Sequence, residues 1–108
     1  MAERAVSWTR TARRDLHAIV GYIAEDNLEN AFAVLDRLQA RAETLSDNAQ
    51  RGRVVPELRA IDVYQYRELI EKPWRIVYRI ERDAVLIMAV LDGRRDLRSV
   101  LLERLVRV

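Results

Sequence analysis

Apolar and polar residues alternate most regularly between Trp74 and Ile80. One face of this segment is apolar in every member, and two arginines lie on the other. The apolar face carries Trp74, Ile76, Tyr78 and Ile80, and the opposite face carries Arg75, Val77 and Arg79. A period of two is typical of a β-strand that buries one side. We therefore expect a strand with its apolar side in the core and a cationic side facing outward.

Two further strands flank this one in the sequence. The first runs from about Val63 to Ile70, and the second, apolar at every position, runs from Val85 to Leu91. The connections, Glu71-Lys72-Pro73 and Glu81-Arg82-Asp83, are short, which favours antiparallel pairing of neighbours. The continuous apolar run predicts a central strand that is buried on much of both faces.

Two segments before the strands repeat apolar residues at helical spacing. The first stripe is Ala12, Leu16, Ile19, Val20 and Ile23, and the second is Ala31, Leu35, Leu38, Ala42 and Leu45. Thr9 or Thr11 is a candidate N-cap for the first helix, and the spacing of Asp26 and Glu29 suggests a capping box for the second. Because so few residues separate the stripes, we expect an antiparallel helical hairpin.

The remaining segments complete the predicted order. Val6-Ser7-Trp8 suggests an N-terminal strand, and the aliphatic residues between Leu97 and Leu105 suggest a short C-terminal helix. Ser46 to about Arg59 shows neither period and is either a binding loop or a solvated connector. The chain is therefore expected to form one α+β domain over residues 1–108: an N-terminal strand, a helical hairpin packed on a curved, mainly antiparallel four-stranded sheet, and a short C-terminal helix.

Composition restricts the function. Of 19 basic residues only Lys72 is lysine, the acids number 17, and the formal net charge is +2. A basic surface must therefore be local, and arginine favours planar contacts to carboxylates and phosphates. The chain has no cysteine, no signal-peptide pattern at its start and no apolar run of membrane-spanning length. We expect a cytoplasmic protein without membrane association.

The chemistry-bearing residues are sparse. A single histidine, the absence of cysteine and three isolated glycines predict no metal site, no phosphate loop and no cofactor. His17 is expected on the polar side of the first helix with Arg13, Arg14 and Gly21. We interpret His17 as an exposed helix residue and not as an acid–base catalyst.

The arginines are the remaining candidates. Arg67, Arg75, Arg79, Arg94 and Arg95 are predicted to form one cationic concavity that binds phosphates or an acidic peptide. The alternative is that each arginine pairs with a nearby acid, such as Glu68, Glu71, Glu81, Asp92 or Asp96. For Arg75 and Arg79 we favour the docking role, because solubility alone does not explain two arginines on one face of a central strand.

Four segments together match a known family pattern. They are Val6-Ser7-Trp8 before Ala12-Arg13-Arg14-Asp15-Leu16, then Tyr66-Arg67-Glu68-Leu69, then Pro73-Trp74-Arg75-Ile76-Val77-Tyr78-Arg79-Ile80, and finally Val90-Leu91-Asp92-Gly93-Arg94-Arg95-Asp96-Leu97. Over nearly its whole length the chain resembles the ParE branch of the RelE/ParE toxin superfamily of bacterial toxin–antitoxin systems. The third and fourth segments are its most specific part.

The resemblance implies a fold of the kind derived above and a cytoplasmic, growth-inhibiting toxin held inactive by an antitoxin. ParE-type toxins inhibit DNA gyrase, whereas RelE-type toxins cut messenger RNA on the ribosome. RelE-type cleavage uses basic residues with a tyrosine or histidine near the C-terminus, and this chain has neither after Tyr78. We therefore expect gyrase inhibition by binding, with no catalytic residue. The alternatives are a RelE-type ribonuclease and a non-toxic, antitoxin-binding regulator.

The expected partners are a ParD-like antitoxin and DNA gyrase, without sequence-specific recognition of nucleic acid. An acidic, amphipathic antitoxin segment is predicted to lie over the helical hairpin and to reach the arginine face. The candidate apolar contacts are Tyr22, Phe32 and Trp74. The candidate polar contacts to antitoxin or target are Arg67, Arg75, Arg79, Arg94, Arg95 and Asp96.

Overall fold

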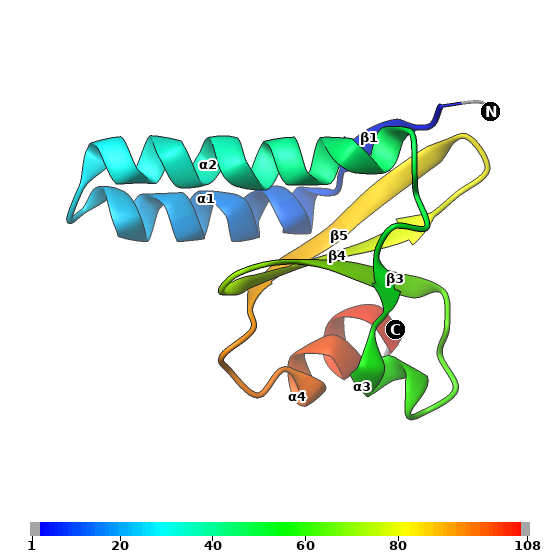
Figure 1. The fold of residues 1–108 in the computed structure, drawn as a ribbon. Helices are drawn as coiled ribbons and strands as arrows, with labels where there is room; N and C mark the ends of the chain where they lie inside the picture. Colours follow the sequence, from blue (N-terminus) through cyan, green and yellow to red (C-terminus); the bar gives the residue numbers. More distant parts are fainter. Residues whose placement is uncertain (1–2, 107–108) are drawn as a thin grey trace.

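The structure is a computed structural model that describes residues 3–106. Its elements are β1 (Ala5–Trp8), α1 (Arg10–Ala24), α2 (Leu28–Glu43), the 3-10 turn η1 (Thr44–Ser46), β2 (Arg53–Val54), α3 (Pro56–Arg59), β3 (Tyr66–Glu71), β4 (Trp74–Ile80), β5 (Ala84–Asp92), α4 (Arg98–Leu101) and the π-helical turn η2 (Leu102–Val106). Figure 1 shows three layers, with the α1–α2 hairpin on one face of the sheet and α3 and α4 on the other. None of the helices within residues 3–106 has the length and apolarity needed to cross a membrane.

The α+β arrangement is confirmed, but the sheet has five strands instead of four. Its order is β1-β5-β4-β3-β2, with β1 parallel to β5 and the other neighbours antiparallel. The additional strand, β2, lies within the segment expected to be a loop and pairs Arg53 with Glu68 and Val54 with Arg67. A strand of two residues is too short to show a hydrophobic period, which explains why the sequence did not predict it.

The hairpin begins as predicted at one helix and differently at the other. Thr9 caps α1, since its Oγ1 accepts a hydrogen bond from the backbone N–H of Ala12 (3.1 Å). The capping box predicted for α2 is wrong: Asn27 is the N-cap, and its Oδ1 accepts from the backbone N–H of Asn30 (2.9 Å). Asn27 has the extended backbone conformation that an N-cap requires.

The main core lies between the hairpin and the sheet. Leu38 and Leu45 from the helical side meet Ile76, Tyr78 and other residues of the sheet, and all four of these side chains are fully buried. The face of β4 predicted to be apolar is therefore confirmed as the floor beneath the hairpin. Burial of apolar side chains of this size is the main stabilising contribution to a domain of this length.

A second core covers the opposite face of the sheet. Val77 from β4 packs there in a cluster that also contains Val55, Leu58, Tyr66, Ala89, Leu91, Leu97 and Leu101. The segments that supply the cover are α3 and α4 (Figure 1). The prediction that this face is open and cationic is wrong, because much of it is an apolar interface under two short helices.

Candidate functional site

The site is built around Arg75, which lies at the centre of a buried ion-pair network on the second face of the sheet. Its Nε donates to Glu68 Oε1 (2.6 Å), and its Nη1 and Nη2 donate to the two carboxylate oxygens of Glu57 (2.8 and 2.7 Å). Arg53 Nε donates to the second oxygen of Glu68 (2.8 Å). The side chain of Glu68 is 0 % exposed and that of Arg75 is 10 % exposed. Such a network joins β2, β3, β4 and α3.

The network shifts the ionisation of its members. The bidentate hydrogen bond from Arg75 holds the pKa of Glu57 below its ordinary value, and the same bond raises the pKa of Arg75. Both groups therefore stay charged at neutral pH. Arg75 was expected on an exposed docking surface, but the structure shows the alternative, pairing with acids, for this residue.

An open pocket of about 440 Å³ adjoins this network, and four of its seven lining residues are cationic. It is lined by Arg53, Ile70, Lys72, Pro73, Arg75, Gly93 and Arg94. We call this hollow the basic pocket. Gly93 lies close to this wall: an added Cβ would be 3.0 Å from the carbonyl oxygen of Pro73 and 3.1 Å from the aliphatic stem of Arg75, so a larger residue would crowd the pocket. Cations beside Ile70 and Pro73 suit a carboxylate or phosphate that is attached to an apolar group.

The cations of the basic pocket differ in how far nearby carboxylates neutralise them. Arg94 pairs with Asp92 (Nη2 to Oδ2, 2.7 Å), and these hydrogen bonds lower the pKa of Asp92 to about 2. Arg53 and Arg75 are balanced by Glu57 and Glu68. Lys72 is exposed and forms no ion pair within residues 3–106. The pocket therefore carries a small local excess of positive charge.

Arg67 lies on the opposite face of the sheet. The register pairs Arg67 with Tyr78, so its side chain is on the hairpin side, away from Arg75 and Arg79. Its Nη1 donates to the carbonyl of Gly52 (2.7 Å). The hydroxyl of Tyr78 closes this corner by donating to the carbonyl of Ala49 (2.7 Å) and accepting from the N–H of Gly52 (3.0 Å). The expectation that Arg67 shares a concavity with the other arginines is wrong.

The remaining polar candidates are separated as well. Arg79 lies on the second face but pairs with Glu81 (3.1 Å) at the other end of β4. Arg95 is exposed in the turn after β5, beside Arg94. Asp96 is exposed and accepts a hydrogen bond from the backbone N–H of Arg98 (3.2 Å), so it helps to start α4. Of the arginines predicted to cluster, the structure brings only Arg75 and Arg94 into one pocket.

The apolar candidates divide in a similar way. Tyr22 and Phe32 are 78 % and 57 % exposed near the tip of the hairpin, together with Leu28 at 61 %. Trp74 is partly buried against the main core, and the guanidinium of Arg37 lies 5.8 Å from its ring centroid. Three large apolar side chains are therefore exposed at this end of the hairpin. We call Tyr22, Leu28 and Phe32 the apolar tip.

Sequence reasoning singled out neither Glu57 nor Lys72, and it placed Arg53 only within the segment interpreted as either a binding loop or a solvated connector. Pro56 followed by Glu57 is the usual start of a helix, with proline at the first position and an acid in the first turn, and this was an available signal for α3. Nothing in the sequence placed Lys72 beside Arg94, because the proximity depends on the turn between β3 and β4.

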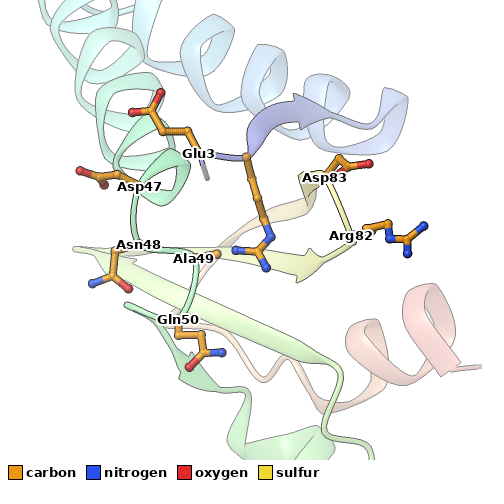
Figure 2. Close-up of a pocket in the computed structure, with 8 residues that line it drawn as sticks. Glu3, Asp47, Asn48, Ala49, Gln50, Arg82 and Asp83 are labelled. Atoms are coloured by element: carbon orange, nitrogen blue, oxygen red, sulfur yellow. The ribbon is translucent and has the colours of Figure 1, made fainter. Parts of the chain in front are cut away.

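A second hollow, of about 460 Å³, lies near the start of β1 (Figure 2). Glu3 and Asp47 lie on one side of it, Arg82 and Asp83 lie on the other, and the side chains of Asp47 and Arg82 point away from its centre. Within residues 3–106 no group of three or more His, Asp or Glu side chains is placed to hold a metal ion. Arg4 also lines the hollow, and its Nε donates to the carbonyl of Glu81 (3.2 Å).

Comparison with solved structures defines the class of the fold. The chain is similar to a structure described as the chromosomal ParDE TA system from P. aeruginosa, with a TM-score of 0.69 and 22% identity over 83% of this chain and 96% of that one. It is also similar to the toxin-antitoxin complex RelBE2 from Mycobacterium tuberculosis, with a TM-score of 0.54 and 26% identity over 85% and 93% of the two chains. The fold is that of ParE/RelE toxins.

Sequence comparison identifies the family. Toxin ParE3 of Caulobacter vibrioides is 32% identical over 90 residues, which cover 82% of this chain and 86% of that protein. The family model described as ParE toxin of type II toxin-antitoxin system, parDE, matches residues 6–97. The chain therefore belongs to the ParE toxin family of type II toxin–antitoxin systems.

Proposed function

We propose that this toxin arrests growth in the cytoplasm by binding DNA gyrase, without catalysis of its own, and that residues 1–108 act as one toxin domain. Family membership over residues 6–97 is the observation that carries the proposal. Two features of the chain support it. No tyrosine or histidine follows Tyr78, and His17 lies exposed on α1, far along the chain from the basic pocket. The available groups suit binding to charged surfaces better than proton transfer.

The contact with the target is proposed to centre on Arg94 and Arg95, with Arg79, Arg67 and Asp96 outside the basic pocket as secondary candidates. Arg94 is 73 % exposed at the pocket rim, so its guanidinium is accessible to a partner even while it pairs with Asp92. Arg75 is given an indirect role, because its buried guanidinium fixes the wall of the pocket on which the exposed cations stand.

A supercoiling assay tests the target. Increasing amounts of toxin are expected to inhibit the supercoiling of relaxed plasmid by gyrase and to cause cleaved DNA to accumulate. The double variant Arg94→Gln/Arg95→Gln should require about tenfold more toxin, the effect of about 1.4 kcal/mol in binding. The matched control is Arg59→Gln/Arg82→Gln, which removes the same charge from exposed positions elsewhere. Gyrase that remains fully active at a molar excess of wild-type toxin would remove the proposal.

We further propose that a ParD-like antitoxin neutralises the toxin by an amphipathic, acidic segment. Its apolar side chains would cover the apolar tip, and a carboxylate would enter the basic pocket. Support comes from the exposure of Tyr22 and Phe32 and from the unpaired Lys72 among the residues the structure describes. Aromatic anchors of this kind usually carry much of the binding free energy of an interface.

Titration calorimetry with the product of the neighbouring gene tests the antitoxin contact. Tyr22→Ser/Phe32→Ser should weaken binding by at least about thirtyfold, since truncation of one anchoring aromatic side chain typically costs about 2 kcal/mol. The control Ile61→Ser/Tyr64→Ser changes two exposed apolar residues outside the hairpin. Equal affinities for the two double variants would show that the apolar tip is not the antitoxin surface.

A RelE-type ribonuclease is the second candidate, favoured by the similarity to the RelBE2 complex. Primer extension on a translated messenger separates the two activities. Discrete cuts within codons after toxin induction would identify the ribonuclease, whereas intact messenger with arrested growth supports gyrase inhibition. Uninterrupted growth with a soluble, antitoxin-binding protein would identify a non-toxic regulator.

A further inference from the structure

The outer surface of α1 carries a cationic stripe that neither the basic pocket nor the apolar tip uses. It consists of Arg10, Arg13, Arg14 and His17, followed by Gly21. These positions recur every three or four residues, so they share one face of the helix. All five are exposed. We call them the α1 stripe.

The stripe has little compensation from the rest of the protein. Within residues 3–106 no carboxylate forms an ion pair with Arg10, Arg13 or Arg14, whereas Asp15, the nearest acid on α1, pairs with Arg104 (2.7 Å) and accepts from the N–H of Val90. The first turn of α1 contains no acid. Arginines at the positive end of a helix, three and four residues apart, oppose both the helix dipole and each other. Stability of α1 therefore does not explain them.

We propose that the α1 stripe docks on the phosphate backbone of duplex DNA. Arginine forks match phosphate oxygens, and three of them on one face form a line of such donors. From Arg10 to Gly21 the helix rises about 16 Å, the length of roughly five base-pair steps. An added Cβ at Gly21 would meet nothing within 4 Å, so the end of the stripe is open to a closely approaching backbone.

Two observations favour DNA over other polyanions. The stripe contains no tyrosine, tryptophan, phenylalanine or large aliphatic side chain, so it offers charge but no apolar anchor to a protein partner. The wide major groove of B-form DNA accepts a helix, whereas that of an RNA duplex is too narrow. Recognition of phosphates carries no sequence information, so the interaction is expected to be independent of base sequence. The inference stands without the gyrase proposal, although a toxin bound to a DNA enzyme would have duplex beside it.

Fluorescence anisotropy with a labelled DNA duplex, in the absence of gyrase, tests the inference. The wild-type protein is expected to bind with micromolar affinity at low salt, as non-specific DNA-binding proteins do. The triple variant Arg10→Gln/Arg13→Gln/Arg14→Gln should bind at least about tenfold more weakly. Its plot of log affinity against log salt should be shallower by about 2.7, because each phosphate contact contributes about 0.9 to the slope.

The matched control is Arg59→Gln/Arg82→Gln/Arg98→Gln, which has the same net charge as the test variant and changes exposed arginines outside α1. It should keep the wild-type slope. The test variant should unfold at the same or a higher temperature than the wild type, so weaker binding will not reflect unfolding. If the two triple variants lost equal affinity for the duplex, net charge alone would explain the effect and the inference would be overturned.

Two competitors complete the experiment. Displacement of the duplex by poly-glutamate through the same three arginines would assign the α1 stripe to an acidic protein. Equal affinity for an RNA duplex would show that the stripe does not select DNA, and would overturn the inference. A wild-type protein that binds no duplex at low salt would refute the inference outright. Gyrase inhibition is measured separately, so failure of either proposal is visible without the other.

Discussion

The buried network around Arg75 makes a sharp prediction about stability. Changing Arg75 to Met removes the guanidinium that bridges Glu57 and Glu68 and keeps most of the side-chain volume. Glu68, with its side chain 0 % exposed, is then left with Arg53 as its only cationic partner in the network. Glu57, with its side chain 28 % exposed, can turn towards water. The loss therefore falls mainly on one buried carboxylate.

The expected magnitude follows from this geometry. Breaking a buried ion pair from one side typically costs about 3–5 kcal/mol. Because Arg53 remains and Glu57 is partly exposed, we expect the lower end, about 3 kcal/mol. For a domain of this length this lowers the unfolding temperature by roughly 12 °C. The double variant Arg75→Met/Glu68→Met removes the orphaned carboxylate as well and should recover to within about 1 kcal/mol of the wild type.

Urea unfolding followed by circular dichroism measures these values. Arg79→Met is the control, since it lies on the same strand and face but its pair with Glu81 is partly exposed, at 34 % and 46 % of the two side chains. It should cost less than about 1 kcal/mol. If Arg75→Met were no more destabilising than this control, the ion pairs of Arg75 would not stabilise the fold. The same conclusion would follow if the loss of stability in the double variant equalled the sum of the losses in Arg75→Met and Glu68→Met.

The pH dependence gives a second check on the same variant. The pKa of Glu57 is lowered in the folded protein from its ordinary value of 4.5. Its pairing with Arg75 therefore adds stability that is fully present above that value and is lost as the pH falls through the lowered pKa. The difference between wild type and Arg75→Met should be constant near neutrality and should narrow in acid below about pH 4.5.

Three further changes test other parts of the structure. Tyr78→Phe leaves two buried backbone groups without a partner and should lower the free energy of unfolding by about 1–3 kcal/mol in urea melts. Gly52→Ala pushes a Cβ into the backbone oxygen of Glu68 and against the hydroxyl of Tyr78, so it should lower the unfolding temperature markedly. Gly21→Ala meets nothing within 4 Å and should stabilise by about 0.5–1 kcal/mol in the same thermal melts. Arg94→Gln should move the pKa of Asp92 from about 2 towards its ordinary value of 3.8, as read from carboxyl NMR shifts.

The regular elements were predictable because each has a hydrophobic period long enough to identify it. The helical stripes of α1 and α2 and the alternation in β4 define the hairpin and the main core, and the short turns fix the antiparallel neighbours. The segment from Ser46 to Arg59 was not predictable in the same way. Its apolar residues Val55 and Leu58 are fully buried, but β2 and α3 are too short to display a period.

The candidate site was predicted only in part, because the positions of arginines depend on register. Arg67 precedes a strand position that faces the second core, so a shift of one residue decides which side of the sheet it occupies. Pairing partners supplied by other elements are equally invisible in a local pattern. Glu57 reaches Arg75 from α3, a helix whose start is signalled by Pro56 and Glu57 but whose position over the sheet no local pattern specifies.

One feature of the sequence did indicate that the second face of the sheet is covered. The run from Val85 to Leu91 is apolar on both faces, and a strand of that kind needs cover on both sides. Arg75 faces the same side as Val77, beside such a strand, so it could not lie on an open surface without exposing its apolar neighbours. An arginine on a covered face must be paired, because the cost of burying its charge alone is far larger than any gain from packing. The apolar character of β5 thus indicated cover on this face. Arg75, opposite Leu91, lies under that cover, whereas Arg79, opposite Leu86, keeps its side chain 34 % exposed.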